Sequence, residues 1–133
     1  MNDTMRLVVG VVAGAVVAIL CVIALEMLGH TLYPPPPGTD ISDPEQMKAL
    51  MANAPAAALA IVAAAWFLGS LLGAIVANRV ARRAVAGWIV ALLMIAGAVY
   101  TLVIIPHPLW MQVCAILLPL LGAWLAQRLT KVA

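Results

Sequence analysis

One carboxyl group lies within a long apolar run, and its neighbours along the chain could share chemistry with it. Glu26 is the only acidic residue placed in such a run; His30 follows it by one helical turn and Tyr33 by two. Residues four apart on a helix project from the same face, so the spacing permits a hydrogen bond between Glu26 and His30. Because an ionised group in a membrane is costly unless paired or hydrated, Glu26 must face protein or water.

Three more polar residues are expected near Glu26. Tyr100 and Gln112 each lie within about two turns, at about 5.4 Å per turn, of the outer ends of their helices, and His107 lies in the turn between those helices. These groups either hydrogen-bond to one another and lock the bundle, or form an outward-facing site in which Glu26 and His30 bind a ligand or carry protons. Glu26, His30 and His107 could hold a metal, but their spacing matches no known fingerprint. The cofactor, if any, is unknown from the sequence, because these residues indicate no particular one.

The composition indicates the elements that must position these groups. With 66% hydrophobic and 9% charged residues, the chain cannot be an ordinary soluble domain. Its apolar runs are long enough to cross a membrane and predict an all-α bundle within a single membrane domain, residues 1–133. The expected transmembrane helices are residues 7–32, 55–77, 84–105 and 109–127.

The first loop, residues 33–54, is expected to contain a short helix. Four prolines, 34–37, end the first long helix. Ser42 and Glu45 have capping-box spacing, with Pro44 in the first turn of the predicted helix. Apolar side chains then recur at helical spacing on the face opposite Lys48, at Met47, Leu50, Met51 and Ala54. This pattern predicts an amphipathic helix in the outer interface, either as a plain linker or as a lid.

The basic residues predict the orientation. Six of the seven fall before the first long helix, between the second and third, or after the fourth, and Lys48 alone falls in the first loop. By the positive-inside rule, both termini are cytoplasmic, and we expect a bacterial inner membrane. The positive charges would meet lipid headgroups, so nucleic acid is not an expected partner.

Small residues indicate where helices pack. Gly10 and Gly14 in the first long helix, and Gly69 and Gly73 in the second, have the small-xxx-small spacing that lets backbones approach closely. The same spacing would also serve self-association. We expect bulk at Gly73 to be more disruptive than bulk at Gly87.

Three buried side chains carry further expectations. Cys21 and Cys114 differ in expected depth by about 9 Å, more than a disulfide tolerates, so both should be free thiols. Trp66 lies deep in the second long helix, where a place in the core is favoured over a place above the polar site.

Three functional classes are consistent with these features. The first is an accessory or assembly subunit with a polar pocket in its outer half, whose partners would be membrane lipids and either a second copy or another membrane protein. The alternative is an oligomeric transporter or a metal or proton site using Glu26 and His30. The third is a membrane-embedded enzyme acting on a lipid-like substrate, which the residues favour least because they contain no recognisable catalytic set.

Overall fold

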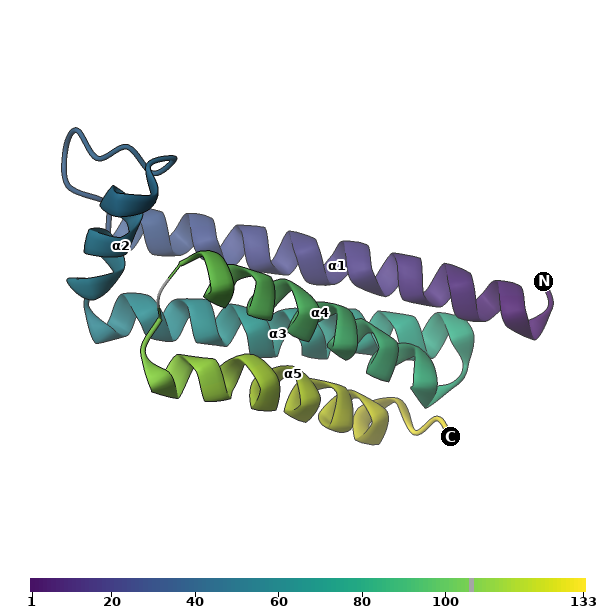
Figure 1. Ribbon diagram of the computed structural model, residues 1–133. Coiled ribbons are helices and arrows are strands. Elements are labelled where there is room, and N and C mark those ends of the chain that lie inside the picture. The colour runs from purple at the N-terminus through teal and green to yellow at the C-terminus, as the bar shows by residue number, and fades with distance from the viewer. Residues whose placement is uncertain (106) are drawn as a thin grey trace.

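The computed structural model of this chain describes residues 1–105 and 107–133. Its helices are α1 (Asp3–Leu32), α2 (Pro44–Ala52), α3 (Ala56–Ala81), α4 (Ala84–Ile104) and α5 (Leu109–Thr130) (Figure 1). All except α2 are long and apolar enough to cross a membrane. The chain is therefore a multi-pass membrane protein with the predicted four-helix bundle. The short helix predicted in the first loop is α2.

The helix α3 occupies the centre of the bundle. It packs against α1, α4 and α5, and α4 also packs against α1 and α5. Both termini and the α3–α4 connection lie at one end, which we call the termini end (Figure 1). The helix α2 and the loop before it cross the opposite end, which we call the α2 end. The six basic residues that predict the orientation all belong to the termini end.

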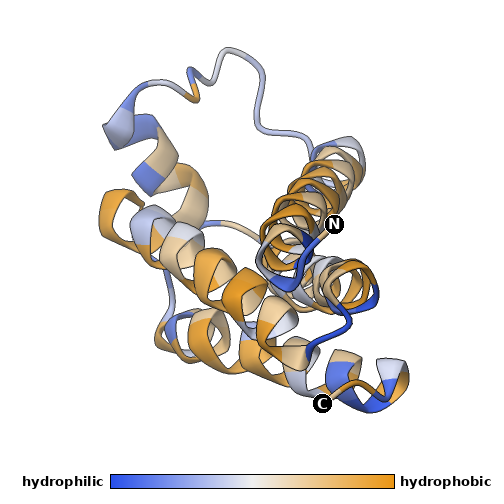
Figure 2. Ribbon diagram, turned by 90° about the vertical axis from the view of Figure 1, so that its right-hand side faces the viewer, coloured by the Kyte–Doolittle hydropathy of each residue, from blue (hydrophilic) through white to orange (hydrophobic). Residues whose placement is uncertain are grey.

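Apolar side chains cover the outside of the bundle. On α1 they include Val12, Val16 and Ile23, and on α4 they include Leu92 and Val103, all exposed. Figure 2 shows hydrophobic residues along the helices and hydrophilic residues near the termini. Since lipid rather than water solvates such a surface, these side chains suit the membrane interior.

The glycines of α1 and α3 meet where the two helices cross. A Cβ built on Gly14 would lie 2.5 Å from the carbonyl oxygen of Gly73, and one built on Gly73 would lie 2.6 Å from the carbonyl oxygen of Gly14. Gly10 faces the backbone of Ala77 in the same way, and Gly69 lies against α1 at Ala18. The four glycines thus line one contact within the chain, where larger side chains would hold the backbones apart.

Gly87, where bulk is expected to be less disruptive than at Gly73, is packed as closely as Gly73, with a nearest atom 2.6 Å from a built Cβ at both positions. A Cβ on Gly87 would lie 2.6 Å from the side-chain oxygen of Asn78, and the Gly87 amide donates a hydrogen bond to that oxygen at 2.8 Å. The open position on α4 is Gly97, where a Cβ would have no neighbouring atom within 4 Å among the described residues.

The long helices extend past their apolar runs. The helix α1 begins at Asp3 rather than residue 7, because the Asn2 side chain caps it by accepting from the Met5 amide at 2.8 Å. The helix α3 continues to Ala81, where Arg82 adopts a left-handed conformation (φ 59°) that ends it. The helix α5 ends in the same way at Lys131 (φ 53°). Hydropathy could not mark these boundaries because capping residues are polar.

Side-chain hydrogen bonds join the helices in mid-bundle and toward the termini end. The Ser70 hydroxyl of α3 donates to the Pro119 carbonyl of α5 at 2.7 Å. Asn78 is fully buried and donates to the Thr130 hydroxyl at 3.3 Å, in addition to accepting from Gly87. The Trp88 indole donates to the Gln127 side chain at 2.9 Å. These hydrogen bonds therefore link α3, α4 and α5 to one another away from the α2 end.

Candidate functional site

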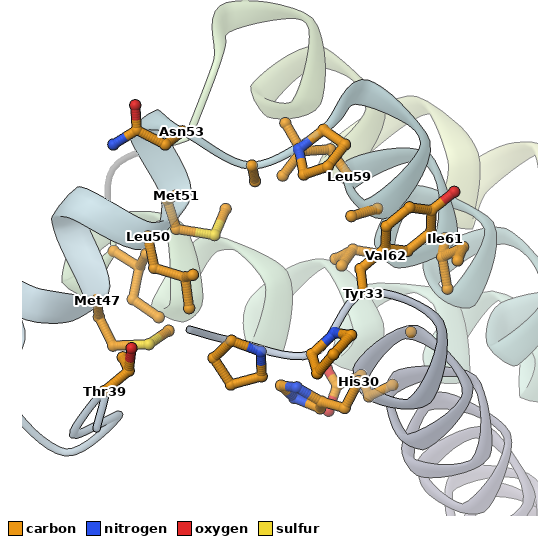
Figure 3. Close-up of a pocket in the computed structure, with 18 of the residues that line it drawn as sticks. His30, Tyr33, Thr39, Met47, Leu50, Met51, Asn53, Leu59, Ile61 and Val62 are labelled. Atoms are coloured by element: carbon orange, nitrogen blue, oxygen red, sulfur yellow. The ribbon is translucent and has the colours of Figure 1, made fainter. Parts of the chain in front are cut away.

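A cavity of about 870 Å³ lies beneath α2. Its walls come from the last turns of α1, the apolar face of α2, the first turns of α3 and the end of α4 (Figure 3). Most of the side chains around it are apolar. This volume falls within the roughly 300–1,000 Å³ typical of pockets that bind small molecules.

The helix α2 forms one wall with the side chains that the periodicity predicts. Met47, Leu50 and Met51 are half-buried and line the cavity, whereas Lys48 on the other face is exposed. Figure 3 shows these three side chains directed from α2 across the cavity. Met51 and Ala54 also pack against the buried cluster around Leu59 and Trp66, which anchors the C-terminal end of α2 to the bundle.

The N-terminal end of α2 is capped by Asp43 and not by Ser42. The Asp43 carboxylate accepts from the Glu45 amide at 3.1 Å, so the cap residue lies one position after the predicted one. The Ser42 hydroxyl and amide instead donate to Asp40. The hydroxyl bond first, and then the amide bond, lower the pKa of the Asp40 carboxyl. Gln46, which accepts from the Asp40 amide, links this loop to the cavity.

The helix α1 forms a second wall with Glu26, His30 and Tyr33. Glu26 and His30 are both exposed and, as predicted, lie one turn apart. The hydrogen bond that their spacing permits is not formed, and within residues 1–105 and 107–133 no hydrogen bond or ion pair involves the Glu26 carboxyl. Among the described residues, no such bond ties Glu26 to another helix.

The end of α4 and the turn after it form the third wall. His107 lines the cavity, and its Nδ1 lies 2.6 Å from the carbonyl oxygen of Ile105. Its ring centroid is 6.4 Å from that of Trp66, which is buried in the core as favoured by the sequence. Thr101 also lines the cavity, while its hydroxyl donates to the Gly97 carbonyl at 3.1 Å. Pro106, part of the same predicted turn, lies outside the described residues.

Tyr100 and Gln112 do not join this site. Tyr100 is 69% exposed on the outer surface of α4. Gln112 is also exposed, and its side chain donates to the His107 carbonyl at 3.2 Å. Of the five candidate polar residues, the structure brings Glu26, His30 and His107 to one cavity and leaves these two outside it.

The metal candidates do not form a metal site by themselves. In the described parts of the chain, no three His, Cys, Asp or Glu side chains gather closely enough to hold a metal ion. Cys21 and Cys114 are free thiols, as expected.

A second, smaller hollow of about 550 Å³ lies at the termini end, against α5. Trp124, Arg128 and Lys131 line it, and the Arg128 guanidinium lies 5.1 Å from the centroid of the Trp124 ring. Fewer described residues line it than line the cavity beneath α2. No family model, curated protein or solved structure matches this chain.

Proposed function

We propose that this protein is a small accessory membrane protein that holds one lipid-like molecule in the cavity beneath α2. The cavity itself carries this proposal. Its apolar walls suit hydrocarbon. Its few polar side chains, including His30 of α1 and His107 of the α4–α5 turn, come from separate parts of the chain, as they do in sites that orient one end of a ligand.

The construction of the α2 wall supports binding of a guest molecule. In water, or in the headgroup layer, an empty apolar face such as that of Leu50 and Met51 is unfavourable. A lipid-like guest would cover both side chains and the facing wall of α3 at Leu59 and Val62, all of which line the cavity. The apolar surface removed from contact with water would then stabilise the complex at roughly 25 cal/mol per Å².

The test compares two polar substitutions on α2. Leu50→Gln places an amide on the cavity face, whereas Ala52→Gln places the same amide at an exposed position that does not line the cavity. Native mass spectrometry of each protein, extracted in mild detergent, reports co-purified lipid. We expect the lipid-bound fraction to fall about fivefold in Leu50→Gln, which corresponds to losing about 1 kcal/mol of apolar contact, and to be unchanged in Ala52→Gln.

Two outcomes would contradict the proposal. One is a wild-type protein that carries no lipid after mild extraction. The other is equal retention of lipid by the two variants, which would place the lipid elsewhere on the apolar surface.

Transport of protons or cations by an oligomer is a second candidate. Its supporting observation is Glu26, a carboxyl group within α1 that lines the cavity without a hydrogen bond to another described residue. Purified protein in liposomes would then conduct in a way that Glu26→Gln abolishes, because an amide cannot titrate. Flux that is the same in wild type and variant would exclude this function.

The proposal places the protein in a bacterial inner membrane with both termini in the cytoplasm. Six basic residues at the termini end, against Lys48 alone at the α2 end, support that orientation. The cavity would then open toward the periplasmic side. A reporter fused after Ala133 should be active only in the cytoplasm, and periplasmic activity would invert the assignment.

The accessory role also implies a partner in the membrane. The outer face of α1, including Val12, Val16 and Ile19, is exposed and apolar, so it could contact lipid, a second copy or another membrane protein. Mild extraction followed by size determination should recover the chain in a complex larger than its own 13.9 kDa. A monodisperse monomer would argue against a subunit.

A further inference from the structure

The charged group in the cavity wall is acidic. Among the described side chains that line it, Glu26 is the only acid, and neither Lys nor Arg is present. The other described titratable groups in its walls are His30, Tyr33 and His107. Lys48, the basic residue of α2, projects from the opposite, exposed face. A guest therefore meets one carboxylate and no permanent positive charge.

The surrounding loop strengthens this asymmetry. Residues 33–54 contain three carboxyl groups and one lysine, a net charge of −2, although the whole chain is +2. Two of these carboxylates, Asp40 and Asp43, accept hydrogen bonds from their own loop, so they already have partners. The carboxyl group that lines the cavity and lacks such a bond is that of Glu26.

The depth of Glu26 favours a charged partner from the guest. It lies six residues before the end of α1, about 9 Å along the helix axis from Leu32. A carboxylate at such a position in a membrane protein is stabilised by an opposite charge or by water. An ammonium group would supply the charge and N–H donors together, whereas a purely anionic headgroup would meet a like charge.

The remaining walls offer apolar surface for hydrocarbon. Leu50 and Met51 of α2, Leu59 and Val62 of α3, and Ile105 at the end of α4 all line the cavity. Acyl chains attached to a headgroup at Glu26 can therefore lie against these side chains.

Taking the proposed lipid-binding function as its basis, we propose that the guest is a phospholipid with a primary ammonium headgroup, whose ammonium pairs with Glu26. The paired geometry is a charge-assisted hydrogen bond, which is stronger than one between neutral groups. The glycerol and the first parts of the acyl chains then occupy the apolar part of the cavity.

The test offers three dioleoyl lipids that differ in their headgroups. Delipidated wild-type protein in a neutral detergent is mixed with equal amounts of dioleoyl phosphatidylethanolamine, dioleoyl phosphatidylglycerol and dioleoylglycerol, and native mass spectrometry reports the bound fractions. We expect the ethanolamine lipid to be retained roughly tenfold more than dioleoylglycerol, as a hydrogen bond to a charged group allows, and the glycerol phospholipid to be retained least.

Two variants make the result specific to Glu26. Glu26→Gln keeps the size and hydrogen-bonding capacity of the side chain but removes its charge, so the preference for the ethanolamine lipid should fall about tenfold, while dioleoylglycerol binds as before. Lys48→Gln removes a charge from the exposed face of α2 and should leave the order of the three lipids unchanged. Melting temperatures close to that of the wild type would show that both variants are folded.

The outcomes separate this inference from the proposed function. If all three lipids bind equally, or if Glu26→Gln retains the preference, the ammonium assignment is wrong although lipid binding stands. If no lipid binds the wild-type protein, both are wrong. Stronger retention of the anionic lipid would also overturn the assignment and would point to the histidines as phosphate ligands.

Discussion

Replacing Gly14 by alanine should force α1 away from α3, whereas the same change at Gly97 should not. The new Cβ of Gly14→Ala would lie 2.5 Å from the carbonyl oxygen of Gly73 and 2.8 Å from the Cβ of Ala77. Ordinary contacts begin near 3.4 Å, so the helices must separate by about 0.9 Å, the difference between 3.4 and 2.5 Å. Neither a backbone carbonyl nor an alanine Cβ can rotate out of the way.

The expected magnitude follows from this overlap. Overpacking a close contact costs about 1–3 kcal/mol. At Gly97 a Cβ would meet nothing within 4 Å among the described residues, and alanine in a helix interior is favoured over glycine by about 0.5–1 kcal/mol. The two variants should therefore differ in free energy of unfolding by roughly 1.5–4 kcal/mol, with Gly14→Ala the less stable.

Unfolding in mixed micelles measures this difference. Sodium dodecyl sulfate is titrated into each variant in a neutral detergent, and tryptophan fluorescence follows the loss of the buried environment of Trp66. Gly14→Ala should unfold at a lower fraction of the denaturing detergent than wild type, and Gly97→Ala at the same or a higher fraction. Coincident curves for the two variants would show that the close approach of α1 and α3 does not determine stability.

Two further predictions concern hydrogen bonds at opposite ends of the bundle. Asn78→Leu leaves the buried amide of Gly87 without its side-chain acceptor, so the same detergent titration should show the free energy of unfolding falling by about 1–3 kcal/mol. An unchanged midpoint would mean that water or another group replaces the hydrogen bond. In the loop before α2, Ser42→Ala removes the hydroxyl that contributes most to the lowered pKa of Asp40, so an NMR titration should show that pKa rising. Because the folded pKa of Asp40 is lowered, the stabilisation of this loop is present at neutral pH and is lost as the pH falls through that pKa. Identical Asp40 titrations in wild type and variant would contradict this cause.

Periodicity was sufficient to predict α2 and its apolar face. Its apolar residues recur at helical spacing, and the same residues are half-buried in the structure. The spacing of Glu26 and His30 likewise placed both side chains on one face of α1, where they line the cavity. In both cases the relevant contacts depend on one helix and its own geometry, which the sequence specifies directly.

Matching depth was not sufficient to assemble the rest of the site. Tyr100 and Gln112 lie at the depth expected for them. Depth gives only the position of a residue along the helix axis. The direction of its side chain around that axis depends on which neighbours the helix packs against. The face of α4 that turns inward carries Ala98, so Tyr100, two residues later, is turned outward. Similarly, the hydrogen bond from the Gly87 amide to the Asn78 side chain depends on the left-handed conformation of Arg82, which no residue pattern predicted.

The glycine contact and the cavity lie at different positions along α1, and this separation has a measurable consequence. Gly14, which meets Gly73, and Glu26, which lines the cavity, are twelve residues apart on one helix, about 18 Å along its axis. Substitutions that far apart with no shared neighbours are usually additive. The double variant Gly14→Ala with Glu26→Gln should therefore lose the stability of the first variant and the lipid preference of the second. The opposite result would be a fully folded Gly14→Ala variant that has lost the lipid preference. That result would show that the α1–α3 contact positions the cavity wall, so that the two regions form one cooperative unit.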